Sequence, residues 1–202
     1  MIERKAKVTV NEWITHGNDA FLLTGARQIG KTYLIRQCLK ESGYPYIELN
    51  FIEQPELVNL FAGAKDAKEL LMRLSVVAKE PLEQGKTIIF LDEIQHVKQF
   101  EKVLASLKAT QNVSIFVTGS NSKLLSGRLA SLLVGRCKEF KIMPFTYSEF
   151  IKYYEENGLD LPKKSLQNFI RFGGMPQRMD YDLEEDIKEY LKSIYYGIID
   201  KD

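Results

Sequence analysis

The chain has 202 residues, 45% of them hydrophobic and 27% charged, a composition typical of one large globular domain or of a core with a small subdomain. It argues against disordered, collagen-like and coiled-coil chains, and no apolar run approaches the roughly 18 residues that a membrane span needs. The net charge of +1 gives no indication of nucleic-acid or membrane binding.

The first 142 residues alternate between short apolar runs and helical periodicity. The apolar runs predict strands at 20–24, 46–51, 87–91, 113–118 and 138–143. Amphipathic spacing predicts helices at about 31–41, 66–79, 100–107 and 122–134. Such alternation is typical of an α/β fold, in which a mainly parallel sheet is covered by helices on both faces.

After Pro144 the pattern changes to helices alone. Thr146 and Glu149 have the spacing of a capping box, followed by apolar residues on one helical face. Further helices are predicted at about 164–172 and from Asp182 onward. We therefore predict two parts, a core at 1–143 and a small all-helical subdomain at 144–202.

The two ends of the sequence give expectations about the location of the protein and about its further domains. Residues 1–5 lack the apolar stretch of a signal peptide, so we expect a cytoplasmic protein. The final helix is still apolar near Asp202. We therefore expect the protein's own C-terminal domain beyond residue 202.

The segment from Gly25 to Thr32 matches the phosphate-binding pattern G-x-x-x-x-G-K-[ST], the P-loop or Walker A motif, at every fixed position. Glycines let the backbone curve so that its N–H groups face phosphates, and the following helix start favours anions. Lys31 would reach the β- and γ-phosphates of ATP, and the Thr32 hydroxyl would bind Mg²⁺. The residues predicted to bind ATP here are Gly25, Ala26, Arg27, Gln28, Ile29, Gly30, Lys31, Thr32 and Tyr33.

The strand predicted at 87–91 ends in two carboxylates, Asp92 and Glu93. Seen alone, such a pair is often a solvated strand end, but beside a P-loop it resembles the second half of an NTPase site. Asp92 would orient the Mg²⁺ ligands, and Glu93 could polarise a water molecule for attack on the γ-phosphate.

Three kinds of chemistry share these residues. Water activation by Glu93 favours an ATP hydrolase, with Glu93 and Lys31 as catalytic residues. A nucleotide-gated switch or scaffold that binds ATP with negligible hydrolysis is the alternative. A small-molecule kinase ranks third, because it must shield the phosphate from water. No Asn-Lys-x-Asp segment for reading guanine is present, which disfavours GTP.

The strand predicted at 113–118 leads to Ser120 and Asn121. Parallel strands place their carboxyl ends at one edge of the sheet, where ligands bind. Ser120 or Asn121 could therefore touch the γ-phosphate or the attacking water, although a helix cap is a comparable explanation.

Taken together, these segments resemble an AAA+-type P-loop ATPase family of bacteria and archaea, whose ATP-binding core normally precedes a C-terminal domain of uncharacterised function. The resemblance is carried by segments in a fixed order along nearly the whole chain, namely 23–32, 90–95, 117–121, 135–136, 144–146 and 172–176. It implies a five-stranded parallel sheet with the P-loop strand central, the acidic strand not its direct neighbour, and a helical lid after Pro144.

The resemblance also implies roles for individual residues. Ser120 and Asn121 would take the sensor position, and Pro176 would approach adenine through the Gly174-Met175-Pro176 element. Arg136 resembles the arginine finger that reaches a neighbouring subunit, which implies self-association; pairing with Glu139 is the competing explanation. The lid's sensor arginine has no clear match, and Arg178 is its candidate.

Overall fold

The computed structural model describes residues 4–17, 20–62, 64, 66–77, 87–110, 113–119, 135 and 137–199. The chain divides into two compact units. We call Val10–Gly25 with Lys31–Lys141 the sheet unit, and Met1–Thr9, Ala26–Gly30 and Ile142–Asp202 the helical unit. The division predicted at residue 143 remains a prediction, since the helical unit also includes two segments from the first 30 residues.

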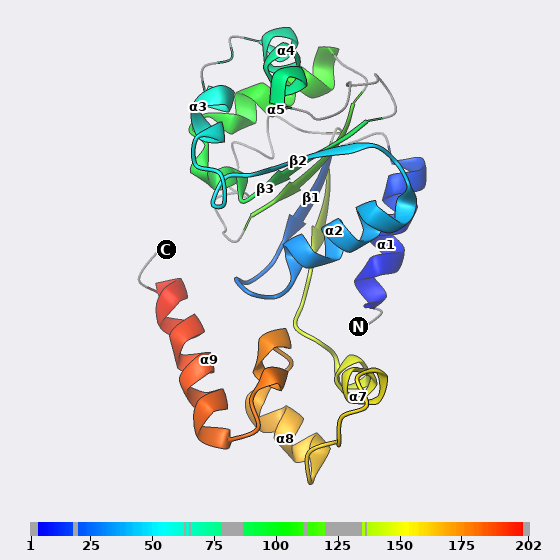
Figure 1. Ribbon diagram of the computed structural model, residues 1–202, viewed down its shortest axis with the longest axis vertical. Helices are drawn as coiled ribbons and strands as arrows, with labels where there is room; N and C mark the ends of the chain where they lie inside the picture. The colour runs from blue at the N-terminus through cyan, green and yellow to red at the C-terminus, as the bar shows by residue number, and fades with distance from the viewer. Residues whose placement is uncertain are drawn as a thin grey trace. The chain divides into compact units, whose positions relative to one another are not determined.

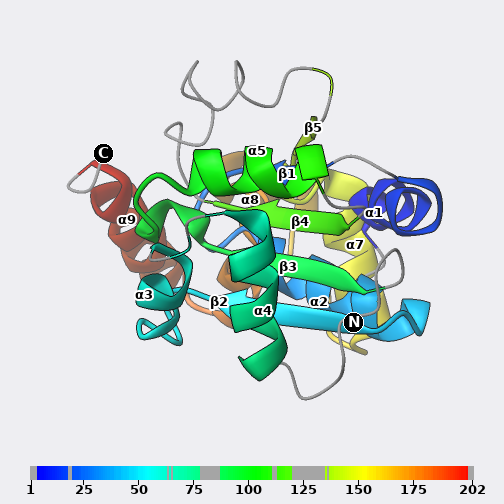
Figure 2. The same ribbon diagram turned by 90° about the horizontal axis from the view of Figure 1, so that it is seen from above.

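The sheet unit is built on five parallel strands in the order β2-β3-β4-β1-β5. The strands are β1 (Ala20–Thr24), β2 (Tyr46–Asn50), β3 (Ile88–Asp92), β4 (Ser114–Thr118) and β5 (Cys137–Lys141). Figure 2 shows β2, β3, β4 and β1 side by side. The predicted five-stranded parallel sheet is therefore confirmed, and β3 is not a neighbour of β1. The middle strand is β4 rather than the P-loop strand β1, which lies beside it.

Alternate side chains of each strand pack into two layers because successive residues point to opposite faces. One face, including Leu22, Leu49 and Val117, packs against α3 (Leu57–Ala62), α4 (Ala67–Val77) and α5 (Phe100–Thr110). On the other face, Trp13 of α1 (Lys5–His16) contacts Phe21 and Phe116. Figure 1 shows α2 (Lys31–Ser42) on the side of the sheet away from α4 and α5.

The sequence did not predict α1, α3 or the short helix η1 (Ile94–His96). The helix predicted at 122–134 lies outside the described residues. The other predicted helices of the core form within a few residues of their expected bounds. The parallel strands all end at one edge of the sheet, which brings the ends of β1, β2, β3 and β4 together.

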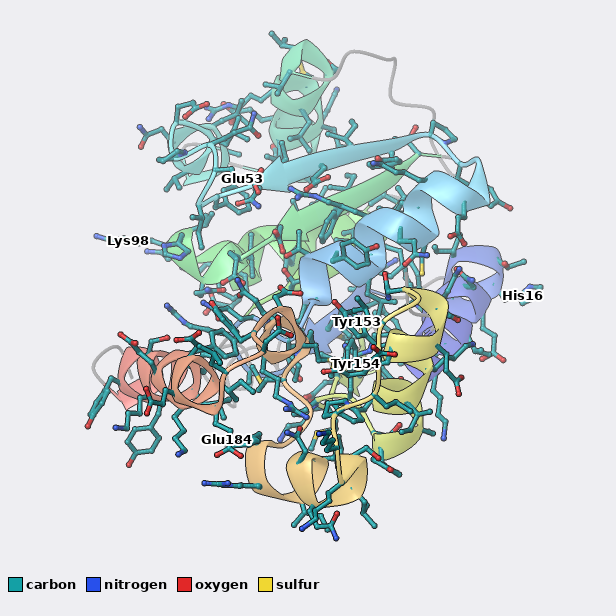
Figure 3. The ribbon with its side chains drawn as sticks, turned by 60° about the horizontal axis from the view of Figure 1, so that its bottom comes forward. His16, Glu53, Lys98, Tyr153, Tyr154 and Glu184 are labelled. Atoms are coloured by element: carbon teal, nitrogen blue, oxygen red, sulfur yellow. The ribbon has the colours of Figure 1, made fainter. Side chains whose placement is uncertain are left out.

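The helical unit contains α7 (Tyr147–Glu156), α8 (Ser165–Phe172), η3 (Pro176–Asp180) and α9 (Glu184–Ile199). The predicted capping box is present: the Thr146 hydroxyl accepts from the Glu149 N–H, and the Glu149 carboxylate accepts from the Thr146 N–H. Phe145, Phe150, Tyr154 and Met179 form the buried cluster of this unit. Tyr153 and Tyr154 lie next to each other on α7 (Figure 3), and the Tyr153 hydroxyl donates to Asp180.

The backbone at Gly174 lies so close to the backbone at Phe145 that a side chain at position 174 is destabilising. The Gly174 carbonyl accepts a hydrogen bond from the Phe145 N–H at 2.7 Å. A Cβ atom at Gly174 would lie 2.0 Å from the Phe145 carbonyl oxygen. Because that neighbour is backbone, the clash cannot be relieved by a rotamer change. We expect Gly174→Ala to lower the free energy of unfolding by about 3 kcal/mol, the upper part of the range for overpacking.

Chemical denaturation monitored by tyrosine and tryptophan fluorescence measures this change. Gly197→Ala in α9 is the matched control, because a Cβ built there meets no atom of the described residues within 4 Å beyond the backbone of its own helix. In a helix interior, alanine is favoured over glycine by up to about 1 kcal/mol, so the control is expected to be neutral or stabilising. Equal stability of the two variants would contradict the close approach at Gly174.

Candidate active site

The loop between β1 and α2 has the backbone conformation of an anion-binding turn. Gly25, Gln28 and Gly30 all have positive φ angles, of 145°, 58° and 88°. Such angles are accessible to glycine without strain, which explains the two glycines of the motif. The Ile29 side chain is buried and anchors the loop, whereas Gln28 is exposed.

Lys31 lies at the first position of α2 and is 4% exposed. Its Nζ donates a hydrogen bond to the Gly25 carbonyl at 3.0 Å, so that the side chain spans the mouth of the loop. A buried ammonium group is costly unless it is paired or hydrogen-bonded. The position of Lys31 therefore suits an anionic ligand that adds negative charge beside it.

The next residue, Thr32, joins the P-loop to the acidic end of β3. The Thr32 Oγ1 lies 2.9 Å from both carboxylate oxygens of Asp92, although the two residues are 60 positions apart in the sequence. The start of α2 and the acidic end of β3 are therefore in direct contact.

Asp92 is 1% exposed and lies in a network of hydrogen-bond donors. Besides Thr32, the Asn50 Nδ2 at the end of β2 donates to Asp92 at 2.9 Å, and the Thr118 hydroxyl at the end of β4 donates to it as well. Burial raises the pKa of Asp92 above the usual value for aspartate, and the hydrogen bonds from Thr118 and Thr32 act in the opposite direction. Donors from two neighbouring strands and one helix thus fix this carboxylate.

Glu93 follows in a strained conformation, with φ 55° and ψ 47° in the left-handed region. A residue other than glycine pays about 1–3 kcal/mol there, and such outliers gather at functional sites. The Glu93 N–H donates to the Thr118 Oγ1 at 3.1 Å, which helps to hold this conformation. The Glu93 carboxylate accepts a hydrogen bond from the Gln95 side chain.

The donor set fits a magnesium ion. A hydroxyl and a carboxylate are hard oxygen ligands, and Mg²⁺ is usually held by one or two such groups together with water and phosphate oxygens. Burial disfavours the charged form of Asp92, and a cation beside it would compensate for the lost solvation. Thr32 and Asp92 are therefore the residues that would hold Mg²⁺.

Comparison with known proteins agrees with this geometry. The family model described as "AAA domain" matches residues 17–151. The chain belongs to this family of AAA+-type P-loop ATPases. An uncharacterized protein of Methanocaldococcus jannaschii is 33% identical over 192 residues, which cover 89% of this chain and 41% of that protein. The chain spans less than half the length of this relative and of an uncharacterized protein of Haemophilus influenzae that it also matches.

Solved structures share the AAA+ fold. The Walker-type ATPase PABY2304 of Pyrococcus abyssi has a TM-score of 0.62 at 19% identity, covering 98% of this chain and 73% of its own. DnaA from Aquifex aeolicus, solved with AMPPCP bound, has a TM-score of 0.56 at 17% identity and covers 95% of this chain and 60% of its own. At these identities the likeness shows the fold alone.

Further residues were predicted for this AAA+ site. Ser120, Asn121 and Arg136 lie outside the described residues. Tyr33 is 54% exposed on α2, and Pro176 begins η3 in the helical unit. Among the described residues, no helix is long and apolar enough to cross a membrane.

Arg178, the candidate sensor arginine, is almost fully buried within the helical unit. Its Nη1 donates to the Asn168 Oδ1 at 3.0 Å, and its guanidinium lies over the Phe150 ring, 4.9 Å from the ring centre. Burial lowers the pKa of Arg178, and the nearby Tyr154 acts in the opposite direction. These contacts give Arg178 a packing role in the helical unit.

Sequence reasoning missed Asn50 and Thr118, two residues of this AAA+ site. Both are the last residue of a strand that ends at the same edge as β1 and β3. A polar residue at the carboxyl end of an otherwise apolar parallel strand is the signal that indicates them. In the sequence analysis, this signal indicated Ser120 and Asn121, which follow β4, but it was not applied to the last residues of the strands.

The double role of Thr118 leads to a prediction. Thr118→Val keeps the shape of the side chain but removes the donor to Asp92 and the acceptor for the Glu93 N–H. A buried polar group left without its partner costs about 1–3 kcal/mol, so we expect a loss of this size in the free energy of unfolding. Any ATP turnover by the chain is also expected to fall by about tenfold or more, because Glu93 loses the contact that fixes its backbone.

Denaturant unfolding and phosphate release measure the two effects in the same protein. Thr15→Val is the matched control, since Thr15 is exposed on α1 and its hydroxyl donates to the Asn11 carbonyl of its own helix. A Thr118→Val protein as stable and active as the Thr15→Val protein would show that the network does not hold the two carboxylates.

Proposed function

We propose that this chain binds ATP with Mg²⁺ and hydrolyses it to ADP and phosphate. The observation that carries the proposal is the contact of the Thr32 hydroxyl with both oxygens of Asp92, which unites the P-loop with the acidic strand end. The membership in the AAA domain family and the fold shared with an AMPPCP-bound protein support it.

Each side chain has a distinct task in this proposal. The backbone N–H groups of Gly25 to Thr32 cradle the phosphates, and Lys31 neutralises charge between the β- and γ-phosphates. Thr32 and Asp92 orient Mg²⁺, which when bound would neutralise charge on the phosphate oxygens. Glu93 accepts a proton from the water whose oxygen attacks the γ-phosphorus, while the bond to the ADP oxygen breaks.

A specific contact favours a second function, the nucleotide-gated switch. The Gln95 side chain donates a hydrogen bond to the Glu93 carboxylate. A carboxylate held in this way is less free to turn toward a water molecule, because one of its oxygens is engaged by Gln95. In the switch, the chain would bind ATP and hydrolyse it negligibly while Gln95 keeps this contact.

Steady-state phosphate release by the purified chain, with ATP in the presence and absence of Mg²⁺, distinguishes these functions. We expect release that requires Mg²⁺ and needs no phosphate acceptor. Tight ATP binding without release would favour the switch. A calorimetric titration showing no ATP binding would contradict both.

The wider setting of this activity is also a proposal. The nucleotide cycle would move the helical lid at 144–202 and a C-terminal domain beyond residue 202, in a cytoplasmic protein. Pro176 would approach adenine, Ser120 and Asn121 would sense the γ-phosphate, and Arg136 would act on a neighbouring subunit. Arg136→Ala mixed with Lys31→Ala should then recover part of the activity that each has lost.

A further inference from the structure

Arg4 connects three segments that are far apart in the sequence. Its Nη1 donates to the Ile29 carbonyl in the P-loop at 2.8 Å, and its Nη2 donates to the Met143 carbonyl after β5 at 2.5 Å. Its Nε lies 3.9 Å from the Glu149 carboxylate, and its guanidinium lies over the Phe145 ring, 4.7 Å from the ring centre. The side chain is only 8% exposed, although it lies near the chain terminus. All of these residues belong to the helical unit.

The contact with Ile29 determines how the P-loop presents its backbone. A trans peptide is planar, so its C=O and the following N–H point in opposite directions. When Arg4 holds the Ile29 carbonyl, the Gly30 N–H is directed to the other side. Gly30 has φ 88°, and a Cβ atom built there would lie 3.9 Å from the Arg4 Nη1. Arg4 thus fixes one of the amides that a phosphate would bind.

Glu149, the ion-pair partner of Arg4, contacts the first turns of two helices. The buried Glu149 carboxylate accepts the N–H of Lys5, the first residue of α1, at 3.1 Å and the N–H of Thr146, which caps α7, at 2.8 Å. Glu149 also balances the charge of Arg4: burial lowers the pKa of Arg4, and the Glu149 carboxylate acts in the opposite direction. One ion pair therefore holds the beginnings of α1 and α7.

We propose that Arg4 is a positioning residue that holds the Gly30 amide in its phosphate-binding orientation and couples the P-loop to the start of α7 through Met143 and Glu149. The role of Arg4 in phosphate binding rests on the proposed ATP binding. The contacts that carry it are present without nucleotide. A ligand that binds the Gly30 N–H would therefore change the position of the Ile29–Gly30 peptide, and with it the position of the Arg4 guanidinium that contacts the start of α7.

The planar fork of arginine is essential for this role, because it donates to two carbonyls at once. Lysine keeps the positive charge but is a single point donor on a flexible stem. Arg4→Lys should therefore keep most of the attraction to Glu149 while releasing one of the two carbonyls. Arg171→Lys is the matched control, since Arg171 forms an exposed ion pair with Glu184 in the same unit.

Hydrogen exchange of the nucleotide-free protein tests the coupling directly. For Arg4→Lys we expect exchange at least tenfold faster at Lys5 and Phe150, whose N–H groups donate to the Glu149 carboxylate and to the Thr146 carbonyl, with little change in Arg171→Lys. In the P-loop, the amide resonance of Gly30 should shift in Arg4→Lys and stay in place in Arg171→Lys. A change in only one of the two segments, or in neither, would overturn the proposal. This measurement does not depend on ATP binding, so it decides the Arg4 role even where the proposed function fails.

ATP affinity is a second measurement. It would not change if Arg4 only stabilised the fold. We expect Arg4→Lys to bind ATP about tenfold more weakly, the lower end of the effect of one hydrogen bond to a charged group. Glu149→Gln, which lies outside the P-loop, should also weaken ATP binding, and the double variant should lose no more than Arg4→Lys alone. Additive losses, or wild-type affinity in variants that are only less stable, would overturn the coupling.

Discussion

Replacing Lys31 with alanine is expected to weaken ATP binding on the order of 100-fold or more. Lys31 is 4% exposed, and its Nζ lies 3.0 Å from the Gly25 carbonyl of the P-loop. A hydrogen bond to a charged group contributes about 1.5–3 kcal/mol, and Lys31 would contact two phosphates. Calorimetric titration with ATP and Mg²⁺ measures the loss.

The control for Lys31 lies on the same helix. Lys40 is exposed near the end of α2, and Lys40→Ala removes the same charge without touching the P-loop. We expect its ATP affinity to match that of the unchanged protein. If Lys31→Ala also retained that affinity, the P-loop assignment would be wrong.

The fold could be predicted from the sequence wherever burial imposes a pattern. β1 and β3 are apolar at nearly every position because both faces of the sheet are covered, and all five residues of each strand are buried. The capping box at Thr146 and Glu149 was equally readable, because it depends on two residues three positions apart.

The helix α1 was missed because its own sequence does not specify it. It contains β-branched residues and lacks an acidic first turn, so its local signals for a helix are weak. What stabilises it is tertiary: Trp13 packs against Phe21 and Phe116, and the Lys5 N–H is capped by Glu149, 144 positions away. A partner so distant leaves no local trace in the sequence.

The candidate site shows the same division. The motifs that contain Lys31, Thr32, Asp92 and Glu93 have a fixed spacing, so the sequence indicates their chemistry. The left-handed backbone of Glu93 has no such signal, since glutamate is an unusual residue for that conformation. The contact of its N–H with Thr118 helps to hold this conformation. Thr118 lies close to Glu93 because β4 is the neighbour of β3 in the sheet.

Replacing Glu93 with glutamine is expected to slow ATP hydrolysis on the order of 100-fold or more while leaving ATP and Mg²⁺ binding nearly unchanged. The amide has almost the same shape as the carboxylate but cannot accept the proton of the attacking water, and loss of a general base costs about 10²–10⁴-fold. Rates of phosphate release at saturating ATP and calorimetric affinities separate the two effects. Glu56→Gln is the control, because Glu56 is exposed and precedes α3.

The Gln95 contact makes this prediction sharper. Gln95→Ala frees the Glu93 carboxylate from its hydrogen bond, so hydrolysis should become faster where that contact restrains the base. Combined with Glu93→Gln, the Gln95 change should have no further effect, since the base that it restrains is gone. Wild-type hydrolysis by Glu93→Gln would instead make Glu93 a bystander. The strained backbone that Thr118 holds at φ 55° would then serve only to shape the sheet edge, and the switch would become the better account of this protein.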